Sequence, residues 1–232
     1  MKVWHTMKEF HAALDLSGTA ARMCIADAAG KVLRNGILPM KRRESAHLAE
    51  FAAGEIASCG GMLDDIKYWS VGIGPGSFTG MRLAAALVAG LSHGDSSIKT
   101  RGVPTATAIS MTVGKNLPEN ALSAVLFDGR NHEILVYCVK RKNGVDEGCS
   151  DGTVLNRDQA ERFFAENRFD LVCAQTHEAD AIKSILPESA IESLQTADDF
   201  DLSGLLRSNK AFDNNLRDLI YIRPAVFTKP LN

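Results

Sequence analysis

Patterns typical of membrane, secreted and metal-binding proteins are missing from this sequence. The longest wholly apolar run, residues 83–91, is far shorter than the about 20 residues that cross a bilayer, and the charged start of the chain lacks a signal-peptide core. The five cysteines are scattered and form no CxxC pair, which favours reduced thiols. The six histidines show no HxxxH or HExxH spacing. We therefore expect a cytoplasmic protein with no membrane segment and no metal site.

The chain also lacks an excess of positive charge. Its 26 Lys and Arg residues are balanced by 28 Asp and Glu residues, which leaves a net charge of −2. A protein that binds nucleic acid alone needs a clear basic surface, so this composition argues against that function. The short cluster Lys41-Arg42-Arg43 is an exception, and it is predicted to be a solvated loop before a helix.

What is present is ordinary globular composition, with 45% hydrophobic and 23% charged residues in 232. That length allows one large domain or two of roughly 100 residues each. Hydrophobic periodicity and turn signals predict the same order of elements twice. The strands expected in the first half are 10–15, 21–28, 31–38, 67–74 and 98–103, and the helices are 45–59 (begun by Ser45), 77–93 and 104–113. The strands expected in the second half are 121–128, 133–141, 153–155 and 170–174, and the helices are 156–166 (capped by Asn156), 177–185 (closed by Pro187) and 201–210.

Hairpins followed by alternating helix and strand favour an α/β fold, with a mixed sheet covered by helices in each half and a cleft between the halves. Gly, Asn and Pro residues interrupt the pattern between 104 and 120. We therefore predict a first lobe over residues 1–103 and a second, smaller lobe over 104–232, with the C-terminal tail a candidate to return to the first lobe.

The most informative segment is the glycine-rich turn at residues 72–82. Four glycines and a proline link a strand to a helix, and the structural turn is assigned to Gly74, Pro75, Gly76 and Gly80. Such a turn lets the backbone approach a ligand closely, and free N–H groups at a helix start can bind an anion. However, the patterns GxxxxGK[ST], GxGxxG and GxSxG are all absent. The alternative is a tight turn with a Ser77 or Thr79 cap and no ligand.

As a longer string, GPGSFTGMRLA resembles the hallmark of the bacterial TsaB (YeaZ) family, whose members are partner subunits in the threonylcarbamoyl modification of adenosine 37 in tRNA. Other segments resemble family features: the first strand and its turn (Ala13-Leu14-Asp15-Leu16-Ser17), the first long helix (from Ser45 to Phe51), the Asp-Ala-Arg turn (Phe127-Asp128-Gly129-Arg130) and the C-terminal motif (Tyr221-Ile222-Arg223-Pro224). The match is strong over residues 10–140 and thin over 141–215. Leu16, Glu44 and Gly129 depart from the family's Thr, His and Ala.

The resemblance implies the ASKHA (actin-like ATPase) fold, which has two ribonuclease-H-like lobes. It also implies a subunit without catalytic residues or a required cofactor, which supports a TsaD-like enzyme together with a TsaE-like ATPase, meets tRNA only through that complex, and forms a homodimer when alone. Active relatives use an Asp of the first hairpin to position a metal-bound phosphate. The candidate nucleotide-cleft residues here are Asp15, Ser17, Gly18, Gly74, Gly76 and Ser77. The alternative for Asp15 is a turn residue that bonds nearby N–H groups.

The helix that contains residues 83–91 is apolar on every face, and such a helix must be buried on every face. One side is expected to pack on the sheet. The small residues on the other side allow close approach of a partner helix, and the family's four-helix interface favours this arrangement. The interface residues predicted on the two helices are Leu48, Ala52, Ala85, Ala86, Ala89 and Gly90. The alternative is a helix wholly internal to the chain.

Two other functions compete with a partner subunit. A small ASKHA-type phosphotransferase or ATPase is suggested by Asp15 and the glycine turn, but Met81 stands where a phosphate-binding Lys would follow Gly80. A metallopeptidase is suggested by the "glycoprotease" label that relatives carry, and the missing metal-ligand spacing argues against it. ATP turnover and zinc content discriminate among the three.

Overall fold

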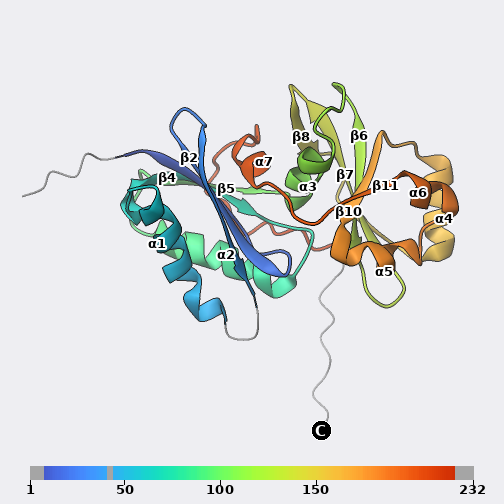
Figure 1. Ribbon diagram of the computed structural model, residues 1–232, viewed down its shortest axis with the longest axis horizontal. Coiled ribbons are helices and arrows are strands. Elements are labelled where there is room, and N and C mark those ends of the chain that lie inside the picture. The colour runs from blue at the N-terminus through green and yellow to red at the C-terminus, as the bar shows by residue number, and fades with distance from the viewer. Residues whose placement is uncertain (1–7, 41–43, 223–232) are drawn as a thin grey trace, which may run out of the picture.

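Each half of the chain folds into a mixed β-sheet with helices packed on it, and the two sheets lie in separate lobes (Figure 1). The computed structural model describes residues 8–40 and 44–222. The basic cluster Lys41-Arg42-Arg43 lies outside the described residues, as do Arg223 and Pro224 of the C-terminal motif.

The first sheet has the strand order β3-β2-β1-β4-β5. Two hairpins make β1, β2 and β3 antiparallel, and β1, β4 and β5 run parallel. Gly30 takes a φ of +80° in the β2–β3 turn, which is the role predicted for it. The strands fall within two residues of their predicted bounds: β1 (Phe10–Asp15), β2 (Ala20–Asp27), β3 (Val32–Pro39), β4 (Ile66–Gly72) and β5 (Lys99–Val103).

Helices α1 (Leu48–Ser58) and α2 (Phe78–Leu91) pack on one face of the first sheet. Ser45 does not begin α1 as predicted. Residues 44–47 form the 3-10 turn η1 (Glu44–His47), and the α-helix begins only at Leu48, which is 2% exposed. Burial of Leu48 against the sheet, rather than a polar cap, therefore determines where the helix begins, and His47 at the N-cap makes no side-chain cap bond. A second short turn, η2 (Leu63–Asp65), precedes β4.

The second sheet has the order β11-β10-β6-β7-β8, and β9 pairs with β7. Its strands are β6 (Leu122–Asp128), β7 (Ile134–Lys142), β8 (Val145–Gly148), β9 (Thr153–Leu155), β10 (Leu171–Gln175) and β11 (Leu194–Ala197). Strands β8 and β11 were not predicted, because four residues carry too little alternation. The turn before β8, Asn143-Gly144, has both residues at positive φ (53° and 75°), and Asn-Gly is a signal that could have identified the hairpin.

The helices on the outer face of the second sheet are α4 (Arg157–Glu166), α5 (Ala179–Lys183) and α6 (Glu188–Ser193). Asn156 caps α4 as predicted, by accepting a bond from the Gln159 amide. The single helix predicted over 177–185 is wrong: a 3-10 turn, η3 (Thr176–Glu178), comes first, and the α-helix ends at Lys183. Pro187 stands at the N-cap of α6, which was not predicted. Proline suits a helix start because a backbone N–H at that position would have no acceptor within the helix, so proline loses no hydrogen bond.

Counted from its own first strand, and with β9 left out of the second sheet, each sheet has the order 3-2-1-4-5, with the first three strands antiparallel and the last two parallel to the first. This repetition confirms the predicted fold class, two ribonuclease-H-like lobes with mixed sheets covered by helices. Helices α3 (Thr105–Val113) and α7 (Ser203–Leu206) lie between the two sheets and contact each other.

The C-terminal part of the chain is held by a buried arginine. A helix predicted over 201–210 ends at Leu206, because the Arg101 guanidinium takes the carbonyl oxygens of Leu205, Leu206, Ser208 and Lys210 at 2.6–3.1 Å. Farther along, the Asn214 amide donates to the Thr100 carbonyl at 2.9 Å, beside β5 of the first sheet. The lobe boundary at residues 103 and 104 stays a prediction.

Candidate functional site

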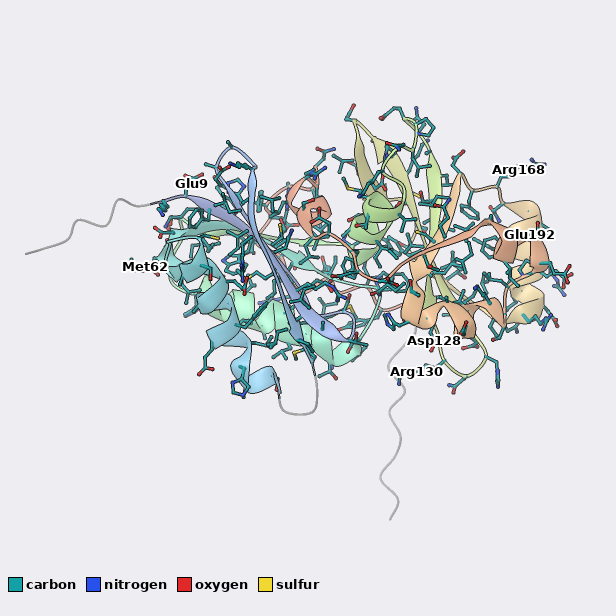
Figure 2. The ribbon with its side chains drawn as sticks, in the orientation of Figure 1. Glu9, Met62, Asp128, Arg130, Arg168 and Glu192 are labelled. Atoms are coloured by element: carbon teal, nitrogen blue, oxygen red, sulfur yellow. The ribbon has the colours of Figure 1, made fainter. Side chains whose placement is uncertain are left out.

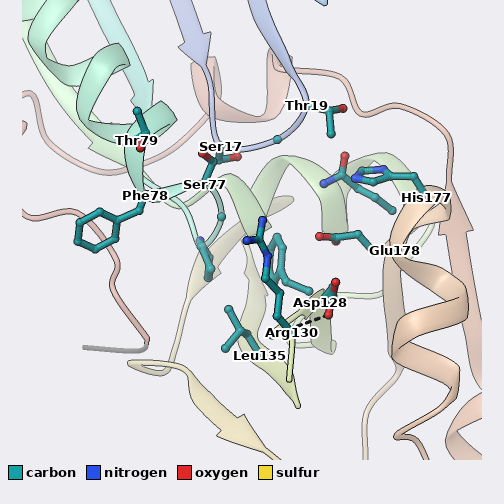
Figure 3. A pocket seen from close by; sticks show the side chains of 16 residues that line it. Ser17, Thr19, Ser77, Phe78, Thr79, Asp128, Arg130, Leu135, His177 and Glu178 are labelled. Atoms are coloured by element: carbon teal, nitrogen blue, oxygen red, sulfur yellow. Dashed lines mark hydrogen bonds between the residues drawn. The ribbon is translucent and has the colours of Figure 1, made fainter. Parts of the chain in front are cut away.

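A cleft of about 940 Å³ lies between the lobes (Figure 3). Its first-lobe wall comes from the β1–β2 turn and the start of α2, and its second-lobe wall comes from the ends of β6 and β10 with η3. The first wall contributes Ser17, Gly18, Thr19, Pro75, Gly76, Ser77, Phe78 and Thr79; the second contributes Phe127, Asp128, Gly129, Arg130, Leu135, Gln175, His177 and Glu178.

Asp15 lies behind the first wall and is not among the residues that line the cleft. Its side chain is fully buried. One carboxylate oxygen accepts bonds from the Ser17 amide (3.0 Å) and hydroxyl (2.8 Å), and the other accepts from the Thr105 hydroxyl (2.5 Å). Burial raises the pKa of Asp15, and these hydrogen bonds oppose the shift. Thr105 Oγ1 also accepts the Gly74 amide at 3.2 Å, so Asp15 joins β1, α3 and the glycine turn.

The glycine turn fits against the β1–β2 turn by backbone contact. The Ser77 amide donates to the Ser17 carbonyl at 2.6 Å, and Ser77 Oγ caps α2 by accepting the Gly80 amide at 3.2 Å, as one of the two predicted caps. A Cβ on Gly80 would overlap the Leu16 carbonyl oxygen, and one on Gly76 would overlap the Ser17 carbonyl oxygen. Glycine at these positions is therefore needed to bring α2 this close to β1.

Only some of the residues predicted for a nucleotide cleft line the observed cleft. Ser17, Gly18, Gly76 and Ser77 line the cleft, whereas Asp15 and Gly74 do not. Gly74 takes a φ of +97° and precedes Pro75 through a cis peptide bond. The Ser77 hydroxyl is engaged in the α2 cap and the Ser17 hydroxyl donates to Asp15. The groups that the first wall presents to a ligand are therefore backbone amides of the α2 start and the hydroxyls of Thr19 and Thr79.

The second wall carries charge. The Asp128 carboxylate accepts the Arg130 amide at 2.8 Å and so shapes the turn after β6. In Figure 3, Asp128 and Glu178 point into the same part of the cleft, and Arg130 extends past them towards Ser77. Figure 2 shows Asp128 and Arg130 near the junction of the lobes, far from Arg168 and Glu192. This wall therefore presents two carboxyl groups and one guanidinium.

Glu178 is perturbed by its surroundings. Burial raises its pKa to about 7, the nearby Asp128 carboxylate adds to the rise, and a hydrogen bond from the Asp128 backbone opposes it. Glu178 Oε2 and Gln175 Oε1 are both buried without a hydrogen-bond partner. The whole Gln175 residue is only 4% exposed. Burial therefore favours the neutral acid form of Glu178 in the folded protein.

Sequence analysis missed Gln175, His177 and Glu178. Gln175 ends β10 and the other two follow it. Because β10 runs parallel to β6, all three line the same cleft as Asp128, at the carboxyl edge of the sheet. Ligand sites in α/β proteins gather at this edge. The signal was a polar run directly after a buried strand.

Arg22 on β2 lies where the lobes meet. Its Nε binds the Asp199 carboxylate at 2.5 Å and its guanidinium stacks on Phe200 at 4.6 Å. Its Nη1 is buried without a partner. Both Arg22 Nη1 and Gln175 Oε1 lie within 4 Å of the place where a Cβ on Gly18 would stand. A donor of the first lobe and an acceptor of the second therefore approach the same glycine.

The predicted interface residues fall into two groups. Leu48, Ala52 and Ala85 are buried within the chain, at 2%, 0% and 9% exposure, so α1 and α2 use them against their own sheet. Ala86, Ala89 and Gly90 of α2 are exposed. At the start of α2, Phe78 and Arg82 meet Tyr221 of the tail, with Arg82 Nε donating to the Tyr221 hydroxyl at 3.0 Å. The exposed residues of α2 are Thr79, Arg82, Ala86, Ala89 and Gly90, so its second half presents small residues to solvent.

Within residues 8–40 and 44–222, no group of three or more His, Cys, Asp and Glu side chains is arranged to hold a metal ion. No helix of the described part of the chain has both the length and the apolar character that crossing a membrane requires.

The fold is shared with proteins of known structure. YeaZ from Pseudomonas aeruginosa superposes with a TM-score of 0.68 at 20% identity, over 85% of this chain and 89% of that chain. An uncharacterized protein with similarity to peptidase YeaZ, from the same organism, gives 0.67 at 18%, over 85% and 88%. Component A of (R)-2-hydroxyglutaryl-CoA dehydratase from Acidaminococcus fermentans gives 0.50 at 9%, over 85% and 95%. No curated protein matches the sequence.

Residues 29–205, more than half of the chain, match the model of the family "TsaD: tRNA N6-adenosine threonylcarbamoyltransferase". The match covers the glycine turn, the second sheet and most of the cleft. Together with the YeaZ fold, it confirms the resemblance that the GPGSFTGMRLA segment indicates. The chain therefore belongs to the TsaD family, and it has the fold of YeaZ.

Proposed function

We propose that this chain is a non-catalytic partner subunit, which supports a TsaD-like enzyme and a TsaE-like ATPase in the threonylcarbamoyl modification of tRNA adenosine 37. The main support for this proposal is the burial and hydrogen bonding of the Asp15 carboxylate. The carboxylate that would position a metal-bound phosphate in an active relative is buried, and both of its oxygens accept internal hydrogen bonds. An acid held in this way supports the turn and is not available to a phosphate.

The mild net negative charge of −2 supports the same assignment. A subunit without an excess of positive charge leaves most phosphate contacts to other proteins. We therefore assign tRNA contact to the assembled complex and not to this chain alone.

The proposed contact with the enzyme is the small-residue side of α2. Ala86, Ala89 and Gly90 are exposed in a helix whose other side packs on the sheet. Small side chains let two helices approach closely. In the isolated protein a second copy would occupy this surface and form a homodimer with the same patch on both sides, and a TsaD-like protein would replace that copy.

The test is Ala89→Arg, with Ala165→Arg on α4 as the matched control. Both positions are exposed in helices, so both variants should fold. We expect Ala89→Arg to be a monomer in light scattering and to lose co-purification with the TsaD-like protein, because a charge would be buried unpaired at the contact. Ala165→Arg should behave as wild type. An Ala89→Arg protein that stays dimeric and still co-purifies would place the contact elsewhere.

A second candidate is a nucleotide-binding or ATPase subunit, favoured by the first wall of the cleft, where the start of α2 and several hydroxyls meet. ATP turnover with Mg²⁺ tests it. We expect no rate above background from the chain alone. A steady rate that Asp15→Asn abolishes would contradict the non-catalytic proposal. Stoichiometric zinc in the purified protein would instead favour the metallopeptidase alternative.

A further inference from the structure

Two of the five cysteines face each other across a pair of strands. Val139 of β7 pairs with Gly148 of β8 in antiparallel register. One position farther along, the Cys149 amide donates to the Cys138 carbonyl at 3.0 Å. Both thiols are free; Cys149 is exposed and Cys138 is half-buried. Cys138 and Cys149 are therefore direct cross-strand neighbours, and a reagent can reach at least one of them.

Their placement fits the geometry of a disulfide. Residues opposite each other at a hydrogen-bonded position of an antiparallel pair have Cα atoms about 5.5 Å apart, and their side chains leave the sheet on the same face. Disulfide-bonded cysteines have Cα atoms about 4.4–6.8 Å apart. Bond formation therefore needs rotation of the side chains and no large movement of the backbone.

The other three cysteines are placed differently. Cys24 and Cys173 are buried inside strands of the two sheets, where burial raises the pKa of each thiol to about 12. Cys59 follows α1 in the first lobe. Only the pair on the β7–β8 hairpin combines proximity with access to solvent.

We propose that Cys138 and Cys149 are an oxidation site of this protein, and that a peroxide converts them to an intramolecular disulfide. The exposed Cys149 thiolate attacks a peroxide oxygen, which forms a sulfenic acid and releases the other oxygen as water after protonation. The Cys138 thiolate then attacks the Cys149 sulfur, and the sulfenic oxygen leaves as a second water. Two electrons pass from the two sulfurs to one hydrogen peroxide molecule.

The surroundings favour Cys149 as the attacking residue. Burial raises the pKa of the Cys149 thiol, but Lys140 and Lys142 on β7 oppose the rise. Burial also raises the pKa of Cys138, and the neighbouring Cys149 adds to that rise. The Cys138 amide donates to Ser150 Oγ at 3.1 Å, which holds the segment after Cys149 against β7. The resolving thiol therefore stays beside the site where the sulfenic acid forms.

The test treats the full chain with hydrogen peroxide, then alkylates it under denaturing conditions and maps the peptides by mass spectrometry. We expect the number of free thiols to fall from five to three, and a cross-linked peptide that contains Cys138 and Cys149 to appear. Dithiothreitol should cleave this cross-link and restore the two thiols. Cys138→Ser and Cys149→Ser should each abolish this cross-link. Cys59→Ser is the matched control and should retain it.

Three results would overturn the proposal: Cys149 ending as a sulfinic acid while Cys138 is alkylated, a cross-link between subunits instead of within one chain, or an intramolecular cross-link to a different cysteine. Each would show that the two sulfurs do not meet in the folded protein.

Discussion

The two walls of the cleft are built on opposite principles. The first wall carries the glycine turn, and Asp15, which lies behind it, has both carboxylate oxygens hydrogen-bonded, one to Ser17 and the other to Thr105. The second wall carries the Asp128-Gly129-Arg130 turn, and Gln175 Oε1 and Glu178 Oε2 are buried there without partners. A satisfied wall is rigid, whereas a wall with unpaired acceptors holds unused binding capacity.

The glycine motif has a structural role in the first wall. In the first wall, the glycines bring backbone against backbone, and the Ser77 hydroxyl is consumed by the α2 cap. The GPGSFTG segment is therefore a device for placing α2 against β1. Across the cleft, burial and the Asp128 carboxylate raise the pKa of Glu178, and perturbed groups of this kind gather at functional sites.

The largest expected effect belongs to the first wall. Gly80→Ala should lower the free energy of unfolding by about 3 kcal/mol, because the new Cβ would overlap the Leu16 carbonyl oxygen and backbone cannot move aside cheaply. Gly54→Ala in α1 is the control: nothing lies within 4 Å of its Cβ position, and alanine should stabilise the helix by up to about 1 kcal/mol. Urea denaturation measures both. Equal stability of the two variants would show that α2 is not packed tightly against the Leu16 carbonyl at Gly80.

Asp15→Asn should destabilise the protein by about 2 kcal/mol and leave any ATP turnover at background. The amide presents an NH₂ where Asp15 accepts bonds from Ser17 and Thr105, so at least one buried donor loses its acceptor. Denaturation and an ATPase assay on the same sample check the two parts. A variant as stable as wild type would mean that the first wall is not held by this carboxylate.

Gly76→Val should cost about 1–3 kcal/mol. Gly76 has a φ of +154°, and its Cβ would overlap the Ser17 carbonyl oxygen. The effect should be smaller than at Gly80 because Gly76 precedes the helix and the loop can shift. Thermal unfolding reports the loss, and an unchanged melting temperature with normal partner binding would contradict it.

Glu178 should make stability depend on pH. Its pKa rises on folding from 4.5 to about 7, so the folded state favours the protonated acid. The free energy of unfolding should therefore fall as pH rises through this interval, by at most about 3 kcal/mol, and level off above it. Asp128 and Arg130 of the neighbouring turn and His177 of η3 face the same cleft.

Denaturation at pH 5 and pH 8 tests this slope, with Glu178→Gln expected to flatten it. His177→Gln, which changes a neighbouring side chain of the same cleft, is the control and should keep the Glu178 contribution. An unaltered slope in Glu178→Gln would assign the pH dependence to another group.

The smallest expected effect belongs to Gln175. Gln175→Met should change stability by less than about 1 kcal/mol, because it removes an acceptor that has no partner and keeps a similar volume. A large loss of stability would mean that Gln175 makes a hydrogen bond in solution. The buried polar groups of the second wall would then be paired, as those of the first wall are.

Most strands of both sheets were predictable because buried strands are apolar runs bounded by turn residues. Asn156 and Ser77 were predictable caps because each side chain bonds an amide three residues later, a purely local interaction. Elements that depend on distant partners were not. The helix after Asp201 ends early because Arg101, about a hundred residues away, takes its carbonyl groups, and α1 begins at Leu48 because the sheet buries that side chain.

The repeated order of elements, the glycine turn and the family that the turn indicates each depend on residues close together in the chain, so they can be predicted without a structure. Which candidate residues reach the cleft depends instead on contacts between distant parts of the fold. Asp15 and Gly74 belong to the same motifs as Ser17 and Gly76, yet packing against α3 turns Asp15 inward. Gln175 and Glu178 enter the site because β10 lies parallel to β6. Burial and the pairing of distant strands are properties of the folded chain, and no local pattern encodes them.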